Sequence, residues 1–324
     1  MNLTPYPGFL PTIPGYIWRP LQVGDVAALQ RLEEACAPLD GATTLRSAAE
    51  WSAVVAEAAF SQTAVSPAGE IAAVGWLTLE DRVDSVHAFH FGRVQPHFRG
   101  QGIGRALLGW LEAAAVPRLQ EMADGRPAFL RTYFYDLKPQ TIGLLARFGY
   151  ERQYAEDELR LDLRQSLPTA VLRAETAVSP FTPASAGDFY AVYRAAFASR
   201  TTSLLDAAAW AHLFANPDDD EFRPQLSRMM RQGGVPVAYA VVYVEATEPE
   251  TAWISQMGVH QAYRRKGLGR ALLLETVSGL AAAGYREAAL SVNVDNPQAR
   301  ALYEQVGFRL RRRLSVYRKQ VVGG

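Results

Sequence analysis

Hydrophobic and polar positions in the C-terminal half of the chain follow two different periods. Residues 235–244 and 252–259 are rich in β-branched and aromatic side chains, which predicts two neighbouring strands. Residues 267–283 repeat apolar side chains at helical spacing, which predicts a helix. Residues 288–294 indicate a buried strand, and residues 296–306 a short helix. This order of elements predicts a mixed α/β fold in which helices flank a central sheet.

The same plan occurs twice along the chain. Residues 99–108 read RGQGIGRALL, and residues 264–273 read RRKGLGRALL. Residues 145–150, LARFGY, correspond in the same way to residues 303–308, YEQVGF. These two matches lie 165 and 158 residues apart. Nearly constant spacing between long matches predicts two tandem copies of one domain.

A third match pairs the Gly-Asp turn at residues 24–25 with the Gly-Asp turn at residues 187–188, each ahead of a helical pattern. The chain has 324 residues, more than a single hydrophobic core usually holds, which also favours two domains. We therefore expect a proline-rich N-terminal arm over residues 1–13, a first domain over 14–163, a linker over 164–178 and a second domain over 179–320.

Composition narrows the class of protein. Apolar residues make up 49% of the chain and charged residues 20%, as in ordinary soluble globular proteins. Lys plus Arg equals Asp plus Glu at 33 each, which disfavours nucleic acid or an anionic membrane surface as a partner. Cys36 is the only cysteine, so no intramolecular disulfide or cysteine metal cluster can form, and we expect a cytoplasmic protein without a metal site. Without an apolar run of 18 residues, we expect no transmembrane helix.

A strand that runs into Arg-x-x-Gly-x-Gly at the start of a helix has the features of a phosphate site. Arg264, Gly267 and Gly269 form this pattern in the second copy. The glycines allow a tight turn and leave no side chain between the backbone and a ligand. Unpaired amide groups of the first helical turn then face that ligand, and the helix dipole adds positive potential. Neither copy fits the dinucleotide fingerprint or the nucleotide-triphosphate loop.

These residues resemble the signature of the GNAT superfamily of N-acetyltransferases, which is Gln/Arg-x-x-Gly-x-Gly/Ala after the fourth strand. The resemblance covers nearly the whole chain, and the tandem layout is similar to that of mycothiol synthase-like proteins. It implies that acetyl-coenzyme A is the co-substrate, with its pyrophosphate at the turn and its pantetheine arm paired with the preceding strand. The residues that it implicates in the second copy are Met257, Val259, Arg264, Arg265, Lys266, Gly267, Leu268, Gly269, Arg270 and Asn296.

A second family pattern, Asn-x-x-Ala-x-x-Leu-Tyr-x-x-x-Gly-Phe, runs from Asn296 to Phe308. By the resemblance, Asn296 binds the pantetheine or starts the helix, and Tyr303 is the general acid. A phenol with a pKa of about 10 can protonate the thiolate that an amine expels from a thioester. Amide groups near Val259 could polarise the thioester carbonyl, as in an oxyanion hole.

The first copy keeps the glycine turn but departs from the second pattern. Leu145 stands where Tyr303 stands, and Lys138 stands where Asn296 stands. Leucine cannot donate a proton, so we expect the first domain to be catalytically degenerate. Its turn is still a candidate second cofactor site, formed by Arg99, Gly100, Gln101, Gly102, Ile103 and Gly104.

The general base is open at this stage. The family pattern places a glutamate on the fourth strand, at the position of Trp253, and the corresponding residue of the first copy is Ala88. Ser255, Gln256 or His260 could instead hold a chain of water molecules.

The predicted activity is transfer of an acetyl group from acetyl-coenzyme A to a primary amine of a small molecule or peptide, by direct attack in a ternary complex. The alternative is a non-catalytic sensor or scaffold that binds acyl-coenzyme A. The missing carboxylate and the degenerate first copy favour that alternative, whereas Asn296 and Tyr303 favour an enzyme. An aminoacyl transferase that uses charged transfer RNA would need a basic groove, which the neutral charge balance disfavours.

Overall fold

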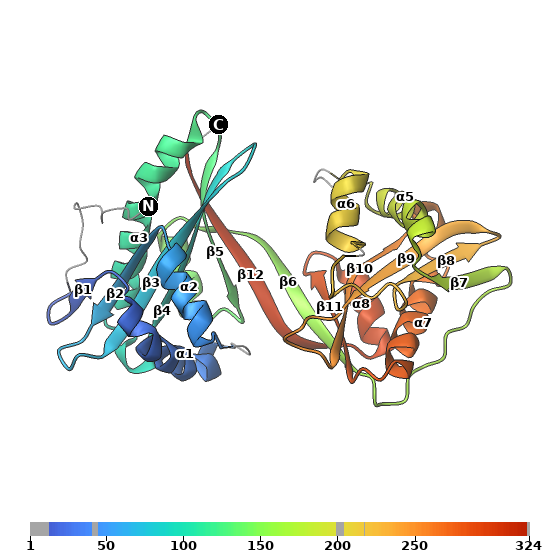
Figure 1. Cartoon of the computed structure of the whole chain (residues 1–324), viewed down its shortest axis with the longest axis horizontal. Helices are drawn as coiled ribbons and strands as arrows, with labels where there is room; N and C mark the ends of the chain where they lie inside the picture. Colours follow the sequence, from blue (N-terminus) through green and yellow to red (C-terminus); the bar gives the residue numbers. More distant parts are fainter. Residues whose placement is uncertain (1–12, 41–44, 199–203, 217, 323–324) are drawn as a thin grey trace. The chain divides into compact units, whose positions relative to one another are not determined.

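A computed structural model of the chain describes residues 13–40, 45–198, 204–216 and 218–322 (Figure 1). Strands and helices form a mixed α/β fold, as predicted. The chain divides into a first unit, residues 1–155 with 312–324, and a second unit, residues 156–311. The expected N-terminal arm, residues 1–13, lies outside the described residues except for Ile13. None of the described helices combines the length and apolarity needed to cross a bilayer.

The first unit contains one sheet with helices on both faces. Its strands lie in the order β1, β2, β3, β4, β5 and β12, and only β4 and β5 are parallel neighbours. Helices α3 and α4 pack on one face and α1 and α2 on the other (Figure 1). The elements are β1 (Ile17–Arg19), α1 (Val26–Asp40), α2 (Ala48–Glu57), β2 (Phe60–Val65), β3 (Ile71–Asp81), β4 (Val86–Val94), α3 (Ile103–Ala123), β5 (Ala128–Tyr135), α4 (Pro139–Arg147) and β12 (Arg309–Val322).

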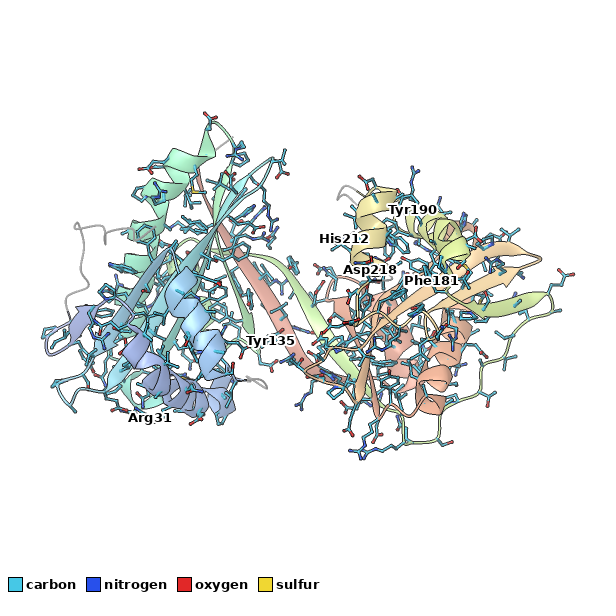
Figure 2. All side chains as sticks on the ribbon, in the orientation of Figure 1. Arg31, Tyr135, Phe181, Tyr190, His212 and Asp218 are labelled. Atoms are coloured by element: carbon cyan, nitrogen blue, oxygen red, sulfur yellow. The ribbon has the colours of Figure 1, made fainter. Side chains whose placement is uncertain are left out.

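The second unit repeats this plan. Its strands lie in the order β6, β11, β10, β9, β8 and β7, and only β10 and β11 are parallel neighbours. Helices α7 and α8 cover one face, and α5 and α6 cover the other with a cluster of aromatic rings that includes Phe181 and Tyr190 (Figure 2). The elements are β6 (Glu151–Asp162), β7 (Thr176–Pro180), α5 (Ala186–Phe197), α6 (Ala207–Phe214), β8 (Arg228–Gln232), β9 (Val235–Tyr243), β10 (Thr251–Val259), α7 (Leu268–Ala282), β11 (Glu287–Asn293) and α8 (Pro297–Val306).

The two units exchange their last strands. Strand β6 ends the first sequence copy, yet Glu156–Asp162 pair with β11 in the second unit. Strand β12 ends the second copy, yet Leu314–Val322 pair with β5 in the first unit. Each compact unit therefore contains residues from both sequence copies, and its bounds differ from those of the predicted domains.

The elements predicted in the second copy are confirmed within one or two residues. Strands β9, β10 and β11 correspond to the three predicted strands, and helices α7 and α8 to the two predicted helices. The earlier match between the Gly-Asp turns is wrong. Residues Gln22 and Asp25 close a capping box that Thr182 and Ser185 repeat, so the structural offset there is 160 residues. Ser185 is therefore the counterpart of Asp25. The Gly-Asp pair at residues 187–188 lies three residues further along, inside α5, and its likeness to residues 24–25 produced the false match.

His90 is a buried polar side chain of the first unit. It lies on β4 with its ring centroid 5.3 Å from that of Tyr150 in an edge-on contact, and its Nε2 has no hydrogen-bond partner among the described residues. Burial, with a smaller effect of Lys319, lowers the pKa of His90 from 6.5 to about 3. The imidazole is therefore neutral in the folded protein over the physiological range.

We expect His90 to make the protein less stable in acid. Its folded pKa is below its unfolded pKa, so the unfolded chain binds the proton first. The contribution of the neutral imidazole to the free energy of unfolding is complete above about pH 6.5 and is lost as the pH falls toward 3. Between these pH values the free energy of unfolding changes by at most about 1.4 kcal/mol per pH unit because of this group. Urea unfolding of wild type and His90→Leu between pH 5 and 7 measures it, and equal slopes for the two proteins would contradict the prediction.

Candidate active site

Strands β10 and β11 separate part-way along their length. Thr251–Trp253 pair with Glu287–Ala289, and no further pairing between these strands occurs in the described part of the chain. The other edge of β10 stays paired with β9 as far as Val259, with a bulge between Ile254 and Gln256. The second half of β10 thus has one free backbone edge, and such an edge can bind an extended amide-containing chain. This is the stretch in which Met257 and Val259 lie.

The glycine turn follows directly after β10. Gly267 is the N-cap of α7 with φ of 81°, and Arg265 has a left-handed φ of 58°. The first unit has the same backbone with glycine at both positions, since Gly100 and Gly102 have φ of 80° and 85°. A left-handed conformation costs a non-glycine residue about 1–2 kcal/mol, so the second unit tolerates strain in order to place an arginine there. Leu268 is buried and fixes the start of the helix.

The Arg264 side chain connects the turn to the end of β10 and to α5. Its Nε donates to the carbonyl of Val259 at 3.3 Å, and a terminal nitrogen donates to the carbonyl of Ala196 near the end of α5. Gly258 permits this close packing, because a Cβ there would lie 2.7 Å from the Tyr239 ring and 3.0 Å from the Cβ of Ala196. The guanidinium thus joins β10 to α5. The contact of Arg264 with a pyrophosphate, expected from the sequence, stays a prediction.

Positive charge at the turn differs between the units. Arg265 and Lys266 are exposed in the second unit, where the first unit has Gly100 and Gln101. The Gln101 side chain also accepts a hydrogen bond from Tyr16 at 2.9 Å. The turn of the second unit is therefore the more cationic of the two.

Helix α8 brings the predicted acid to the same face of the second unit as the turn. Asn296 is its N-cap, and its Oδ1 accepts from the amide of Ala299 at 3.2 Å, so of its two predicted roles the structure has the helix start. Leu302 lies 3.5 Å from the Cβ position of Gly269, which places α8 against the start of α7. Tyr303, the next residue, packs partly buried against the core beneath these helices.

The first unit has the corresponding helix without these groups. The amide of Tyr150 bonds to the carbonyl of Leu145 as the amide of Phe308 bonds to that of Tyr303, which confirms that Leu145 and Tyr303 are equivalent. Leu145 is only 2% exposed and belongs to the hydrophobic core. Lys138, the N-cap of α4, makes no side-chain capping bond.

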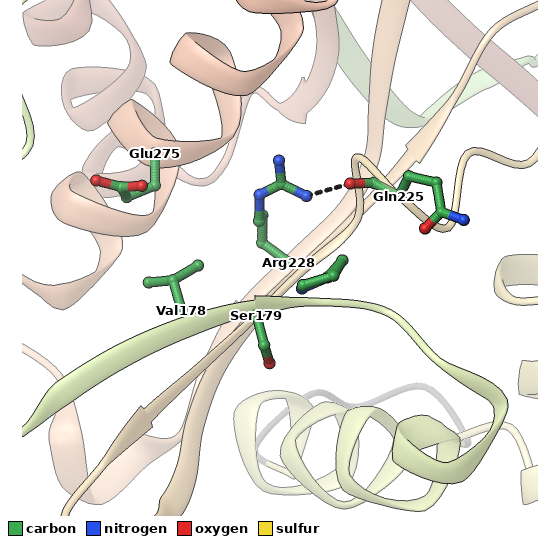
Figure 3. Close-up of a pocket in the computed structure, with 6 residues that line it drawn as sticks. Val178, Ser179, Gln225, Arg228 and Glu275 are labelled. Atoms are coloured by element: carbon green, nitrogen blue, oxygen red, sulfur yellow. Dashed lines mark hydrogen bonds between the residues drawn. The ribbon is translucent and has the colours of Figure 1, made fainter.

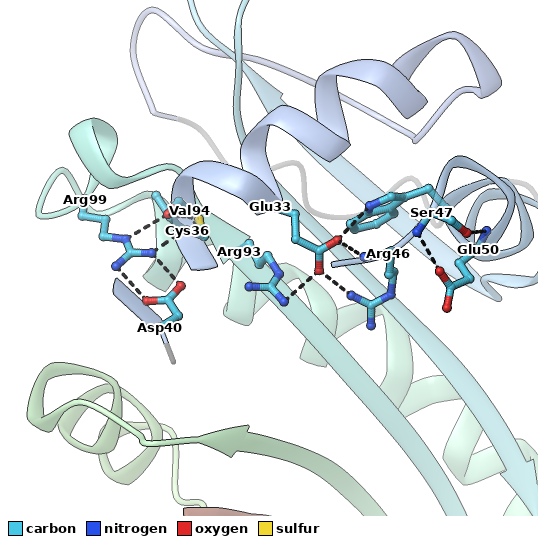
Figure 4. Close-up of polar contacts among 10 residues, drawn as sticks. Glu33, Cys36, Asp40, Arg46, Ser47, Glu50, Arg93, Val94 and Arg99 are labelled. Carbon is cyan, nitrogen blue, oxygen red and sulfur yellow. Dashed lines mark hydrogen bonds and ion pairs between the residues drawn. The ribbon is translucent and has the colours of Figure 1, made fainter. Parts of the chain in front are cut away.

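The turn arginine of the first unit is neutralised by a carboxylate (Figure 4). Arg99 donates to both oxygens of Asp40 at 3.0 and 2.8 Å, to Cys36 Sγ and to the carbonyl of Val94. Cys36 and Val94 take the places of Ala196 and Val259 in the second unit. The bracing role of the arginine is thus common to both copies.

A buried carboxylate fills the α1–α2 side of the first unit (Figure 4). Glu33 is 1% exposed, and its oxygens accept from Arg46, Trp51 and Arg93 at 2.8 to 3.1 Å. In the second unit Gly258 stands where Arg93 stands. This ion-pair network therefore belongs to the first unit alone.

The residues considered for a water chain have these partners. Ser255 Oγ donates to the carbonyl of Val241 at 3.3 Å, and His260 Nδ1 accepts from the amide of Ala262. Gln256 Oε1 accepts two hydrogen bonds, from Trp210 Nε1 at 2.7 Å and from the Tyr239 hydroxyl at 2.5 Å. Sequence reasoning missed these two donors. The sequence held one signal for the first donor: each copy has a tryptophan four residues after the N-cap of a helix, Trp51 after Ser47 and Trp210 after Asp206.

Trp253, at the position where the family pattern has a glutamate, lies beneath a cation. The guanidinium of Arg160 is 4.8 Å from its ring centroid. The predicted correspondence of Trp253 with Ala88 in the two sequence copies is wrong, because the bulge at Ser255 adds one residue to β10 that β4 lacks. The strand registers make Phe89 the counterpart of Trp253.

A surface pocket of the second unit lies elsewhere (Figure 3). Arg228 and Glu275 face it, and Arg228 donates to the carbonyl of Gln225 at 2.5 Å. Burial lowers the pKa of Arg228. None of the predicted cofactor or catalytic residues lines this pocket, which is formed by Val178, Ser179, Pro180, Gln225, Arg228 and Glu275.

The comparisons with known proteins point to one family. A family model described as the acetyltransferase (GNAT) family matches residues 189–308, which lie in the second unit. A mycothiol acetyltransferase from Clavibacter sepedonicus is 31% identical to this chain over 67% of each protein. The chain belongs to the GNAT family of acetyltransferases. A mycothiol acetyltransferase from Geodermatophilus obscurus is 29% identical over 89% of this chain and 92% of that protein.

The fold of this GNAT acetyltransferase agrees with that assignment. The GCN5-related N-acetyltransferase from Sphaerobacter thermophilus has a TM-score of 0.73 and 23% identity, and the match covers 96% of this chain and 98% of that one. The chain is an N-acetyltransferase, and enzymes of this family use acetyl-coenzyme A as co-substrate. An enzyme is therefore favoured over the non-catalytic alternative that the sequence left open.

The second unit has features that fit this co-substrate. The free edge of β10 suits the two amides of a pantetheine arm, and the amide groups at the start of α7 suit a pyrophosphate. A Cβ at Gly267 would meet nothing within 4 Å, so the turn is open on that side.

Proposed function

We propose that this GNAT acetyltransferase transfers the acetyl group of acetyl-coenzyme A to a primary amine of a small molecule or peptide, and that the second unit does the chemistry. The observation that carries the proposal is the arrangement in that unit of a free β10 edge, a cationic glycine turn and Tyr303 on one face. The first unit has Leu145 in place of the acid and pairs its turn arginine with Asp40. It serves as a structural partner without turnover.

The residues that hold the co-substrate are those of β10 and the turn. Met257 and Val259 offer backbone groups to the pantetheine arm, and the amides after Gly267 bind the pyrophosphate. Exposed Arg265 and Lys266 add charge attraction. Asn296 acts indirectly, since its bond to the amide of Ala299 sets the start of the helix that carries Tyr303.

The reaction is a direct attack in a ternary complex. The neutral amine nitrogen attacks the thioester carbonyl, so that a C–N bond forms and the C–S bond breaks. Tyr303 gives its phenolic proton to the departing sulfur, and the proton lost by the amine passes to water. A thiol nucleophile is absent from the sequence of the second unit, since Cys36 is the only cysteine and lies in the first. Burial also raises the pKa of the Cys36 thiol, which disfavours an acetylated cysteine intermediate.

The proposal is tested by incubating the full chain with acetyl-coenzyme A and a panel of primary amines. We expect free thiol to appear in step with an N-acetylated product identified by mass spectrometry. Initial rates measured against both substrates should give intersecting double-reciprocal lines, as a ternary complex requires. Parallel lines would instead indicate an acetylated enzyme, and thiol release without an N-acetylated product would contradict amine acetylation.

A further inference from the structure

Gln256 lies on the open stretch of β10, one residue after the bulge. Its side chain belongs to the face covered by α5 and α6, because it bonds Trp210 on α6 and Tyr239 on β9. Met257 and Tyr303 pack on the opposite face, against the core beneath α7 and α8. An amine that approaches the thioester from the face opposite Tyr303 therefore passes Gln256.

The orientation of the Gln256 amide is determined by its partners. An indole N–H can only donate, so the atom that receives Trp210 Nε1 at 2.7 Å must be the side-chain oxygen. Tyr239 donates its hydroxyl to the same atom at 2.5 Å. Trp210 and Tyr239 are 1% and 0% exposed, and each packs in the aromatic cluster, so neither donor can turn away. Both lone pairs of the oxygen are thus occupied.

The other end of the amide is a donor with no acceptor among the residues that the structure describes. Nε2 carries two N–H groups, and no acceptor for it lies within hydrogen-bond distance among the described residues. An amide nitrogen cannot accept a proton, so Gln256 is excluded as a proton-accepting member of a water chain. A protonated amine cannot bind there either, because both groups would be donors.

We propose that Gln256 determines acceptor specificity by donating a hydrogen bond to an oxygen close to the reacting amine. The inference rests on the proposed function and names its acceptor class, which is a primary amine that carries a carbonyl or hydroxyl oxygen on a neighbouring carbon. Amides held by two buried donors are pre-organised, so the bond to the acceptor forms without loss of side-chain freedom. An acceptor without the oxygen leaves the N–H groups unpaired when it excludes water.

The first unit provides an internal contrast. The strand registers place Phe91 where Gln256 lies, since Phe91 pairs with Trp76 on β3 as Gln256 pairs with Val241 on β9. Trp51 is the counterpart of Trp210, and its Nε1 donates to Glu33 instead. The donor therefore occurs in the unit to which we assign the chemistry and is absent at the equivalent site of the other unit.

The test compares two acceptors of similar size, 2-methoxyethylamine and butylamine, because an ether oxygen can accept a hydrogen bond but cannot donate one. We expect kcat/KM, calculated for the neutral amine, to favour 2-methoxyethylamine by roughly tenfold or more in the wild type. Gln256→Glu keeps an oxygen for Trp210 and Tyr239 but replaces the Nε2 N–H groups with an acceptor oxygen. We expect the preference to fall to near one in this variant, while the Kd of acetyl-coenzyme A stays within a factor of about three.

Trp210→Phe and Trp51→Phe form a matched pair of variants, because only the first removes a bond to Gln256. We expect Trp210→Phe to weaken the preference and Trp51→Phe to leave it unchanged. Acetylation of both amines by the wild type at equal kcat/KM would overturn the inference and leave the proposed function standing. A preference that survives Gln256→Glu would also overturn it. If the wild type acetylates no amine, both proposals fall together.

Discussion

Replacing Tyr303 with phenylalanine should lower kcat by about 10²–10⁴-fold, the usual contribution of a positioned general acid. Phenylalanine removes only the hydroxyl. It keeps the ring that packs against Phe308, with 6.1 Å between the two ring centroids. The fold and the coenzyme site should therefore be preserved, with the Kd of acetyl-coenzyme A within a factor of about three. Steady-state kinetics and calorimetric titration of the same preparation measure the two quantities.

Tyr285→Phe is the control for this variant. Tyr285 also packs partly buried against the core of the second unit, but it follows the far end of α7 and bonds its amide to Leu280. We expect it to leave kcat unchanged. Wild-type turnover by Tyr303→Phe would remove the assigned acid, and an equal loss in both variants would indicate a general packing effect.

Replacing Gly269 with glutamate should raise the Kd of acetyl-coenzyme A by about 100-fold or more. Gly269 has ordinary helical geometry, and a Cβ there would make normal contacts of 3.4 Å to Val259 and 3.5 Å to Leu302. The carboxylate would lie in the first turn of α7, beside the proposed pyrophosphate site. Two like charges about 5 Å apart repel by roughly 3 kcal/mol at the dielectric typical of protein surfaces. Calorimetric titration with acetyl-coenzyme A measures the change.

Gly104→Glu in the first unit is a matched control, because Gly104 occupies the same position of α3 and its Cβ would lie 3.5 Å from Val94. If coenzyme binds only to the second unit, Gly104→Glu leaves the Kd and the stoichiometry unchanged. Loss of one binding equivalent in Gly104→Glu would instead indicate a second cofactor site around Arg99 to Gly104. Loss of binding in that variant alone would move the functional site to the first unit.

Local features of this site could be read from the sequence. The turn at Gly267 is predictable because its conformation depends on glycine itself, and the duplicated motif confirms its place between a strand and a helix. Helix α8 is equally local, since Asn296 caps it through an amide three residues away. The absence of a proton donor at Leu145 also needed no coordinates, because it follows from the residue type.

Features that depend on partners distant in sequence could not be read in this way. Arg264 bonds to Ala196, 68 residues away, and Gln256 to Trp210, 46 residues away. Periodicity along the chain gives no information about such pairs. The bulge at Ser255 changes the register of β10 by one residue without a glycine or proline to mark it.

The exchange of last strands makes the two sequence copies depend on each other for folding. A fragment that ends near residue 164 would contain β6 but lack β12, which pairs with β5 in the intact first unit. A fragment that begins near residue 164 would lack β6. The edge of β11 that pairs with β6 would then be unpaired and could pair with other chains, which favours aggregation. Residues 128–135 must wait for residues 314–322 to be synthesised before their sheet can close. The protein should therefore gain its native structure only after the whole chain has left the ribosome, with long-range pairing as a slow step.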